Sequence, residues 1–583
     1  MSWTCHAGKI NFRVIFRGLA QVGATMLVSG SKAKSCGLVA AFATAAVLVG
    51  ASAASAADMD NMVTKAPPAP AATAPVSCGS LYDFFVTACP LTWSGVTLYG
   101  TVDMGGTYQT HGSPFDPNFP TGASYLLGAG GGNATNRAAG FGWAPNGMSQ
   151  SNVGIKVIEP IAPGGWSFIS QNEIAFDPYS LLLSNAPQAM QNGIGVAENL
   201  QAQPYDSSRW GWLAATNVVG LSQPVFGTMT FGRQNSLLND SLSAYDPMGA
   251  SYAFAMIGYS GKYAGAGGTE EARWTTAIKY RVNVGDFRFA VMGQPIGGAD
   301  GGYNAYNPNN GAVAGQIGSD FRHLGPGVFS WDVVGTWEKD AVNIGTTFPG
   351  QTTVLGWPTS FPSGPAGSGL KATISNNTSI AVLAKYSFGS WGNSPPPVVG
   401  KAPPVPSGPS GIPLTLYAGY EWIQLANPSD PQTSSFLDDG FTFNYVNAHA
   451  SALSANGTTI FNNAFNSNCG SGSGCTSEIF QFAWAGAKYG ITKNLDIIAA
   501  NYIEWQNTFV TGVAACSQGV TLEASNSRCQ GYMDAASLVL DWRFLPKWDW
   551  YIGTMYSVAF GGIANGDISR NNLATTSGVR FRF

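Results

Sequence analysis

The sequence has little charge. Asp, Glu, Lys and Arg make up only 10% of its 583 residues, whereas a typical globular domain carries about 25%. Long apolar runs are also scarce, because beyond one run nothing approaches the roughly 18 uninterrupted apolar residues that a membrane-spanning helix needs. Mean hydropathy is near neutral, at +0.04, although 12% of the residues are aromatic. These values argue against a helical membrane protein and indicate that the apolar residues are dispersed, as alternating β-strands would disperse them.

Histidine is scarce as well. The chain has four histidines, and three of them, His111, His323 and His449, lie beyond residue 57. No Gly-x-Ser-x-Gly, His-Glu-x-x-His or phosphate-loop pattern accompanies them. Hydrolytic sites need a nucleophile or an acid–base set, usually with histidine. We therefore expect no enzyme and no cofactor, with a lipase or protease as the alternative.

The one long apolar run predicts a secretory signal. Lys32 and Lys34 give it a positive start, and small residues end it near residues 54–56. A membrane anchor is the alternative, but the run is rich in alanine and no stop-transfer charges follow it. We predict residues 1–57 as a signal peptide, with Met26 as a possible true start. Removing it takes away five basic residues and no acidic residue, so the formal net charge changes from -4 to -9. An acidic exported protein is a poor partner for nucleic acid.

Six of the eight cysteines remain after that removal. They form three near pairs: Cys78 with Cys89, Cys469 with Cys475, and Cys516 with Cys529. An even number of cysteines in an exported chain favours disulfides. A metal site would need closer, CxxC-like spacing with histidines nearby, and the pairs have neither. We predict three local disulfides and no metal.

Alternating apolar and polar segments bounded by Gly, Pro, Asn and Asp recur throughout the mature chain. They predict sixteen strands, at about 96–108, 151–159, 165–177, 208–221, 226–234, 273–284, 286–296, 311–324, 328–344, 377–389, 412–427, 477–492, 494–508, 532–546, 548–562 and 576–583. Short and long connections alternate between them. This order is typical of an up-and-down antiparallel barrel with tight turns at one rim and long loops at the other.

The two faces of the strands differ. In the segment RWTTAIKYRVNV, Trp274 and Ile278 share one face, while Arg273, Lys279 and Arg281 share the other. In VTLYGTVDM, Asp103 lies opposite the apolar positions. The last residues, GVRFRF, alternate in the same way. A β-sandwich would also alternate, but it would keep its charges outside. A charged face beside an aromatic-rich face in strand after strand predicts a closed barrel in lipid.

Two proline-rich runs stand apart from the strands. They are TKAPPAPAATAP (64–75) and SPPPVVGKAPPVPSGPSG (394–411), and such runs are extended and solvated. By strand parity both lie at the short-turn, periplasmic side, as spacers or as contacts with cell-wall components. We therefore divide the chain into a signal (1–57), a periplasmic Pro/Ala-rich segment with a cysteine pair (58–94), and a barrel (95–583) that includes a proline-rich insertion (390–411).

Several segments resemble the general diffusion porins of Gram-negative bacteria. They are SGVTLYGTVDMGG (94–106), FGTMTFGRQ (226–234) and the closing RFRF, and the opening SCGSLYDFFVTACPLTWSGVTLYG (77–100) is similar to porins of rhizobia and their relatives. The resemblance implies a sixteen-stranded homotrimer in the outer membrane. It also implies that Phe581 and the terminal Phe583 are read by the outer-membrane assembly machinery.

The same resemblance implies an inward-folded third loop that narrows the pore. The matching segment is 235–272, with Asp240 and Asp246 among its acids. The family places basic residues on the wall opposite this loop, and the matching positions here are Arg209, Arg273 and Arg281. Lys279 and Asp103 share the lumen face and complete the predicted constriction. Asn152 stands where the family often has an arginine, so this cluster is thinner.

The implied function is a water-filled channel for passive diffusion of small hydrophilic solutes and ions. Carboxylates facing guanidinium groups across a narrow lumen would orient polar solutes. The acidic mature chain and loop favour a weak preference for cations. The alternatives are a barrel with an adhesive or structural role and a barrel enzyme.

Overall fold

The computed structural model describes most of the chain beyond its N-terminus. Described are residues 78–111, 139–181, 215–257, 273–294, 311–325, 327–339, 376–391, 409–426, 478–508, 529–562 and 570–583, with four two-residue strands between 343 and 373. The chain divides into two units, Met1–Val49 and Gly50–Phe583, and every described residue belongs to the second. The predicted signal peptide and the run 64–75 lie outside the described residues.

Sixteen long antiparallel strands form one closed sheet. They are β2 (Val96–Gln109), β4 (Asn152–Ala162), β5 (Trp166–Ala175), β6 (Asn217–Gln223), β7 (Gly227–Asn235), β8 (Arg273–Val284), β9 (Phe287–Gln294), β10 (Gly311–Leu324), β11 (Gly327–Lys339), β16 (Asn376–Trp391), β17 (Pro409–Ala426), β18 (Glu478–Thr492), β19 (Leu495–Gln506), β20 (Gly531–Leu545), β21 (Trp548–Gly561) and β22 (Asn571–Arg582). Each predicted strand coincides with one of them, so the predicted strand number is confirmed.

Shorter elements complete the described fold. They are the helices α2 (Leu81–Val86) and α4 (Leu237–Tyr245) and the strands β1 (Leu91–Trp93), β3 (Gly140–Pro145), β12 (Asn343–Ile344), β13 (Thr353–Val354), β14 (Trp357–Pro358) and β15 (Ala372–Thr373). Strands β1 and β3 extend the main sheet by pairing with β2. Among the described residues, no helix is long and apolar enough to cross a membrane.

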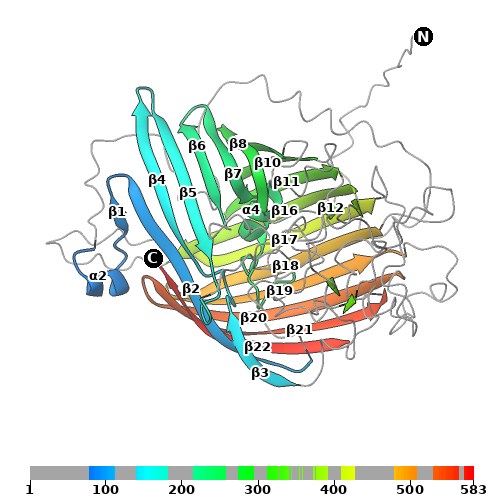
Figure 1. Ribbon diagram of the computed structural model, residues 1–583. Coiled ribbons are helices and arrows are strands. Elements are labelled where there is room, and N and C mark those ends of the chain that lie inside the picture. Colours follow the sequence, from blue (N-terminus) through cyan, green and yellow to red (C-terminus); the bar gives the residue numbers. More distant parts are fainter. Residues whose placement is uncertain are drawn as a thin grey trace, which may run out of the picture. The chain divides into compact units, whose positions relative to one another are not determined.

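The barrel closes where the first and last long strands meet, a junction that we call the seam (Figure 1). Strand β2 pairs with β22 in continuous register from Thr101 opposite Arg582 to Gln109 opposite Ala574. The pairing continues to the end of the chain, because Gly100 and Phe583 exchange two backbone hydrogen bonds of 3.0 and 2.9 Å. Closure leaves no open edge, which lipid could not hydrogen-bond.

Side chains alternate between an apolar outer face and a buried inner face. Exposed apolar residues mark the outer face of nearly every strand: Ile155, Val219, Phe231, Ile278, Val291, Val382, Trp505, Leu538 and Leu573. Charged residues at the intervening positions are buried inside, among them Asp103, Asp332 and Glu504, each 0% exposed. The predicted arrangement of a lipid-facing and a lumen-facing side is therefore confirmed for these strands.

Trp274 departs from the alternation that we predicted for β8. It is 1% exposed and belongs to the buried apolar cluster, whereas Ile278 on the same nominal face is 42% exposed. The register between β7 and β8 shifts between Gly232 and Gln234, beside this point. The simple two-residue period therefore does not hold at the start of β8.

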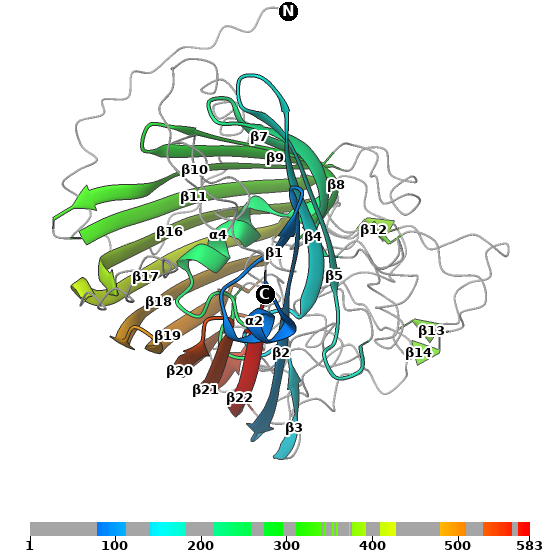
Figure 2. The same cartoon turned by 90° about the vertical axis from the view of Figure 1, so that its left-hand side faces the viewer.

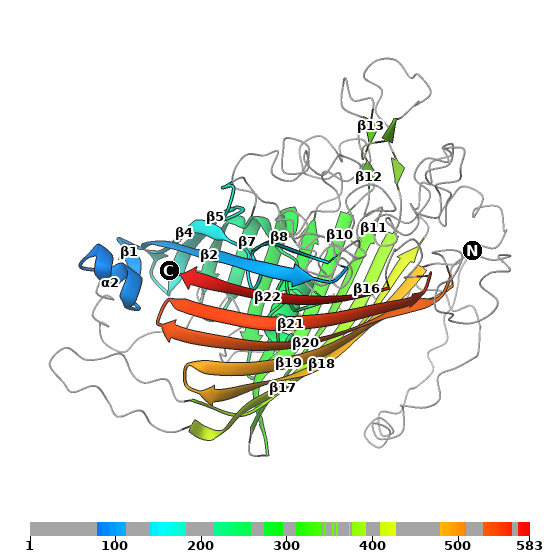
Figure 3. The ribbon, with the colours of Figure 1, turned by 90° about the horizontal axis from the view of Figure 1, so that it is seen from below.

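Short turns lie together at one end of the barrel, the short-turn rim, which also carries the C-terminus (Figure 3). Residues 163–165, 224–226, 285–286, 493–494 and 546–547 form these turns. Both ends of the predicted proline-rich insertion lie in strands, because Trp391 in β16 pairs with Pro409 in β17, and residues 392–408 lie outside the described residues. Two strand starts also differ: β6 begins at Asn217 and β22 at Asn571.

A charge on the outer face tests this assignment. Leu538 lies in the middle of β20 and is 49% exposed. We expect Leu538→Arg to lower the free energy of unfolding from lipid vesicles by about 2–4 kcal/mol, because the guanidinium must enter hydrocarbon. Leu538→Phe, the matched apolar control, should leave it nearly unchanged. Equal stability of the two variants would contradict the lipid-facing assignment.

Candidate pore constriction

The segment between β7 and β8 folds into the barrel, as we predicted for the third loop. We call its described part, residues 236–257, the inner loop. Figure 2 shows its helix α4 inside the ring of strands. Ser236 caps α4, because its Oγ accepts a hydrogen bond of 3.1 Å from the backbone N–H of Asn239. Leu237, Leu238 and Leu242 are 0% exposed, so the helix is held by apolar burial as well as by its cap.

The first turn of α4 is anchored to the wall by charge. Asp240 Oδ2 lies 2.9 Å from Lys279 Nζ and also binds the guanidinium of Arg281, both from β8. Burial would raise the pKa of Asp240, but the charges of Lys279 and Arg281 outweigh it and hold the pKa below the usual value. These three predicted residues are brought together by the fold. They lie in direct contact, however, and not across an open lumen as a transverse field requires.

A second polar contact joins α4 to strands β9, β10 and β11. Arg288 Nη2 donates to Asp332 Oδ2 at 2.5 Å, and Gln316 Nε2 donates to the same oxygen at 2.9 Å. Ser241 of α4 accepts 2.9 Å from Gln316 Nε2 and donates 3.4 Å to Asp332. All four are buried. Sequence reasoning missed this cluster.

The end of α4 reaches strands on another part of the wall. Asp246 accepts a hydrogen bond of 2.6 Å from the Tyr502 hydroxyl of β19 and one of 2.7 Å from the Ala250 N–H. Trp484 Nε1 of β18 donates to the Tyr245 carbonyl at 3.2 Å, and Lys385 Nζ of β16 to the Ala244 carbonyl at 3.2 Å. The predicted constriction residue Asp246 is therefore 3% exposed and fixed to the wall.

Burial also changes the acidity of Asp246, which lies in the inner loop and outside the membrane-spanning strands. Its burial raises the pKa to about 6, against the lowering effect of the hydrogen bonds from Tyr502 and the backbone.

The last described part of the inner loop is fixed near the seam. The Tyr252 hydroxyl donates to Gln150 Oε1 at 2.6 Å, and the Ala253 N–H to the Gly147 carbonyl at 2.8 Å. Ser537 Oγ of β20 donates 2.7 Å to the Phe254 carbonyl. The inner loop thus contacts the wall at strands from β8 through β20.

The Asp103 side chain fixes the connection between β3 and β4, to which the end of the inner loop is hydrogen-bonded. Its carboxylate accepts hydrogen bonds from the backbone N–H groups of Met148 and Ser149, at 2.7 and 2.8 Å, and from the Tyr551 hydroxyl at 2.6 Å. The residue is 0% exposed. Its contacts are those of a structural group that fixes the connection between β3 and β4.

Part of the inner wall is apolar, which sequence reasoning did not predict. Inward-facing side chains from β16 to β21 are buried against one another and the inner loop: Leu383, Ile423, Phe480, Phe482, Trp484, Ile498, Tyr502, Met533, Val539, Tyr551 and Met555. The pattern was visible in β18, where Phe480, Phe482 and Trp484 share the parity of Lys488. An aromatic run in phase with a lumen charge indicates an inner face that packs against protein.

Paired charges line the inner wall nearer the short-turn rim. Asp549 binds Arg580 Nη2 at 2.6 Å and Arg582 Nη2 at 2.8 Å. Asp496 binds Arg543 at 2.7 Å and Lys488 at 3.0 Å. The alternating arginines of the closing RFRF thus find their partner on the neighbouring strand β21.

The other predicted residues divide between described and undescribed parts. Cys78 and Cys89 form a disulfide, as predicted. Cys529 is disulfide-bonded, while its predicted partner Cys516, and also Cys469 and Cys475, lie outside the described residues. Arg209 lies outside them too. Arg273 begins β8, and its side chain is not among those described. A constriction role for these residues stays a prediction.

The closed barrel with an apolar exterior and an internal loop defines a membrane-spanning channel fold. Residues 43–394, more than half of the chain, match the family model described as Gram-negative porin. The chain therefore belongs to the Gram-negative porin family and is an outer-membrane diffusion channel. No curated protein sequence matches it.

Solved porin structures resemble the fold at low sequence identity. The anion-selective porin from Comamonas acidovorans is 13% identical, covering 84% of this chain and 99% of its own, with a TM-score of 0.45. The outer membrane channel DcaP of Acinetobacter baumannii is 11% identical, with coverage of 84% and 99% and a TM-score of 0.39. OmpF of Salmonella typhi in complex with daunomycin is 10% identical, with coverage of 85% and 100% and a TM-score of 0.38.

Removing the charge of Asp240 tests the anchor of α4. Asp240→Asn removes the carboxylate that binds the buried Lys279 and Arg281, and breaking such a buried pair costs about 3–5 kcal/mol. We expect a loss of that order in the free energy of unfolding in detergent. The control is Asp534→Asn, the same charge change at an outward residue bonded to Asn501, which should remain near wild type. A wild-type value for Asp240→Asn would show that these charges do not hold the inner loop.

The raised pKa of Asp246 predicts a pH dependence. Between the ordinary value of 3.8 and about 6 the folded protein holds a proton that the unfolded chain has lost. The contribution of Asp246 to the free energy of unfolding is therefore greatest at low pH. It falls by about 3 kcal/mol at most as the pH rises through that window. The difference in free energy of unfolding between wild type and Asp246→Asn, measured across this window, should fall accordingly. A difference that is constant with pH would contradict the prediction.

Proposed function

We propose that the protein is a general diffusion channel, a homotrimer that passes small hydrophilic solutes and ions through each barrel. The observation that carries the proposal is the combination of a closed apolar-sided barrel with a loop folded into its interior. Such a loop would narrow the pore without closing it. The Gram-negative porin family supports the same reading.

The lumen supports a modest selectivity. In the described residues, Asp332 binds one basic side chain, and Asp240 and Asp549 bind two each, so these contacts add no negative charge to the lumen. Formal charge in the mature chain remains about -9 if residues 1–57 are removed. We therefore propose a weak preference for cations. The export signal at residues 1–57 and recognition of Phe583 by the assembly machinery belong to the same proposal.

Single-channel current in planar bilayers tests this function. We expect steady ohmic steps, grouped in threes for a trimer, and a small cation-selective reversal potential under asymmetric KCl. A clear anion-selective potential would contradict the proposed selectivity. Absence of any conductance from protein that is folded by circular dichroism would contradict the channel and favour the adhesive or structural barrel. Lipase and protease assays on the same sample address the enzyme alternative.

A further inference from the structure

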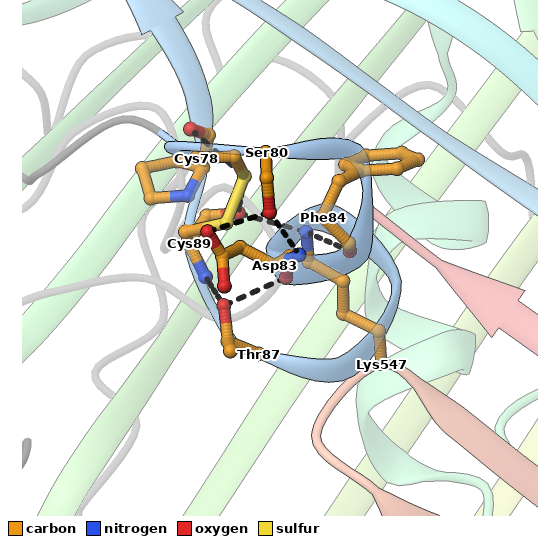
Figure 4. Close-up of a disulfide and its surroundings, with 8 residues drawn as sticks. Cys78, Ser80, Asp83, Phe84, Thr87, Cys89 and Lys547 are labelled. Atoms are coloured by element: carbon orange, nitrogen blue, oxygen red, sulfur yellow. Dashed lines mark hydrogen bonds between the residues drawn. A yellow bond between two sulfur atoms is a disulfide. The ribbon is translucent and has the colours of Figure 1, made fainter.

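Residues 78–93 form a compact cap at the short-turn rim, where α2 and β1 lie near the C-terminus (Figure 3). Figure 4 shows the disulfide of this cap and the residues around it. Helix α2 has only six residues and is too short to be stable alone. Ser80 caps its start by accepting 3.1 Å from the Asp83 N–H, and Thr87 Oγ1 donates 2.8 Å to the Asp83 carbonyl. The Cys78–Cys89 disulfide closes the segment on itself. The cap is therefore an ordered unit although it contains little regular structure.

Hydrogen bonds fix the cap to the turn between β20 and β21. Lys547 Nζ donates to the carbonyls of Phe84 and Cys89, at 3.0 and 2.7 Å, and lies 4.4 Å from the centroid of the Phe84 ring. Trp548 Nε1 donates to the Phe85 carbonyl at 2.9 Å. Strand β1 adds three register pairs with β2. The cap is thus tied to both sides of the seam.

Aromatic rings complete the attachment. Phe84 packs edge-on against Phe581 and Phe583, with centroids 5.6 and 5.4 Å apart, and Phe581 stacks on Trp548 at 4.4 Å. Phe581 faces outward like Val579, yet it is only 7% exposed, whereas Val579 is 37% exposed. The alternation of GVRFRF places Phe581 on the lipid-facing side of β22, but the cap covers it.

The outer side of the cap is apolar and exposed. Leu81 and Tyr82 are each 73% exposed. Beside them a row of aromatic rings begins at Phe85. Its ring centroid lies 6.4 Å from that of Trp548, Trp548 lies 6.4 Å from Phe544, and Phe544 lies 5.6 Å from Trp542. Phe544 and Trp542 are 37% and 47% exposed on the barrel's outer face. The exposed side of the cap is therefore continuous with the aromatic end of the lipid-facing surface.

We infer that Leu81 and Tyr82 form a lipid-binding surface, through which the cap enters the membrane interface at the short-turn rim. Tyrosine and tryptophan prefer this interface, because one part of the side chain is apolar and the other polar. A second protein is a poorer fit, since a stable interface buries about 800 Å² per partner, more than one exposed turn of helix offers. The inference rests on the proposed function only in requiring a membrane-inserted barrel.

Photocrosslinking in vesicles tests this inference. A benzophenone amino acid replaces Tyr82 in the full chain, which is folded into phosphatidylethanolamine–phosphatidylglycerol vesicles and irradiated, and adducts are identified by mass. We expect lipid adducts at a yield comparable to that of the same replacement at Leu538 on the barrel exterior. The replacement at Lys493, an exposed polar residue of another turn on the same rim, should give several-fold less.

The outcomes separate this inference from the proposed channel. Lipid adducts at position 538 but not at 82 would overturn the lipid-binding surface and leave the barrel intact. Crosslinked multimers through position 82, in place of lipid adducts, would overturn it in favour of contact with a second copy. Absence of lipid adducts at 538 would instead contradict the membrane barrel itself. Conductance equal to wild type in the position-82 variant would confirm that the barrel has folded.

Discussion

Closure of the backbone hydrogen-bond network is the constraint on which this structure depends. Lipid offers no partner to a free N–H or C=O, so every strand in the membrane must have two neighbours. The seam between β2 and β22 satisfies this requirement to the last residue, where Gly100 and Phe583 exchange two backbone hydrogen bonds. A Cβ at position 100 would lie 2.6 Å from the Phe583 ring, so glycine there leaves room for the terminal ring beside β2. The outer surface of this closed cylinder is apolar because it meets lipid, whereas its inner surface carries both paired charges and the apolar side chains that pack against the inner loop.

Inside the cylinder, the inner loop packs against the barrel wall. Its attachment has two kinds of contact with different physical demands. On one side, Asp240 binds Lys279 of β8 and Ser241 binds Asp332 of β11. Pairing there offsets the cost of burying charge. From β16 to β21 the wall supplies apolar side chains, and the loop packs there largely by burial. Because the loop is held along both kinds of surface, it packs as part of the wall, and its acids Asp240 and Asp246 bind wall residues.

At the seam, the last side chains of the chain also have partners on both faces of the sheet. Phe581 and Phe583 end the chain on its outer face, where the disulfide-bonded cap covers them. Arg580 and Arg582 point inward and bind Asp549. The closing alternation of phenylalanine and arginine is thus satisfied on both sides, by aromatic packing outside and by an ion pair inside.

The sequence by itself determined the strand number, the alternation of short and long connections and the two faces, whereas the inward loop was expected only from the resemblance to general diffusion porins. These features are local or periodic, since a strand's two-residue period and a turn's composition are written in neighbouring residues. Only the tertiary structure decided which charges meet. The contact of Asp240 with Lys279 and Arg281, the burial of Asp246 against Tyr502 and the cover over Phe581 join segments separated by tens to hundreds of residues. Parity assigns a side chain to a face, but it cannot say whether water, lipid or another part of the chain lies against it.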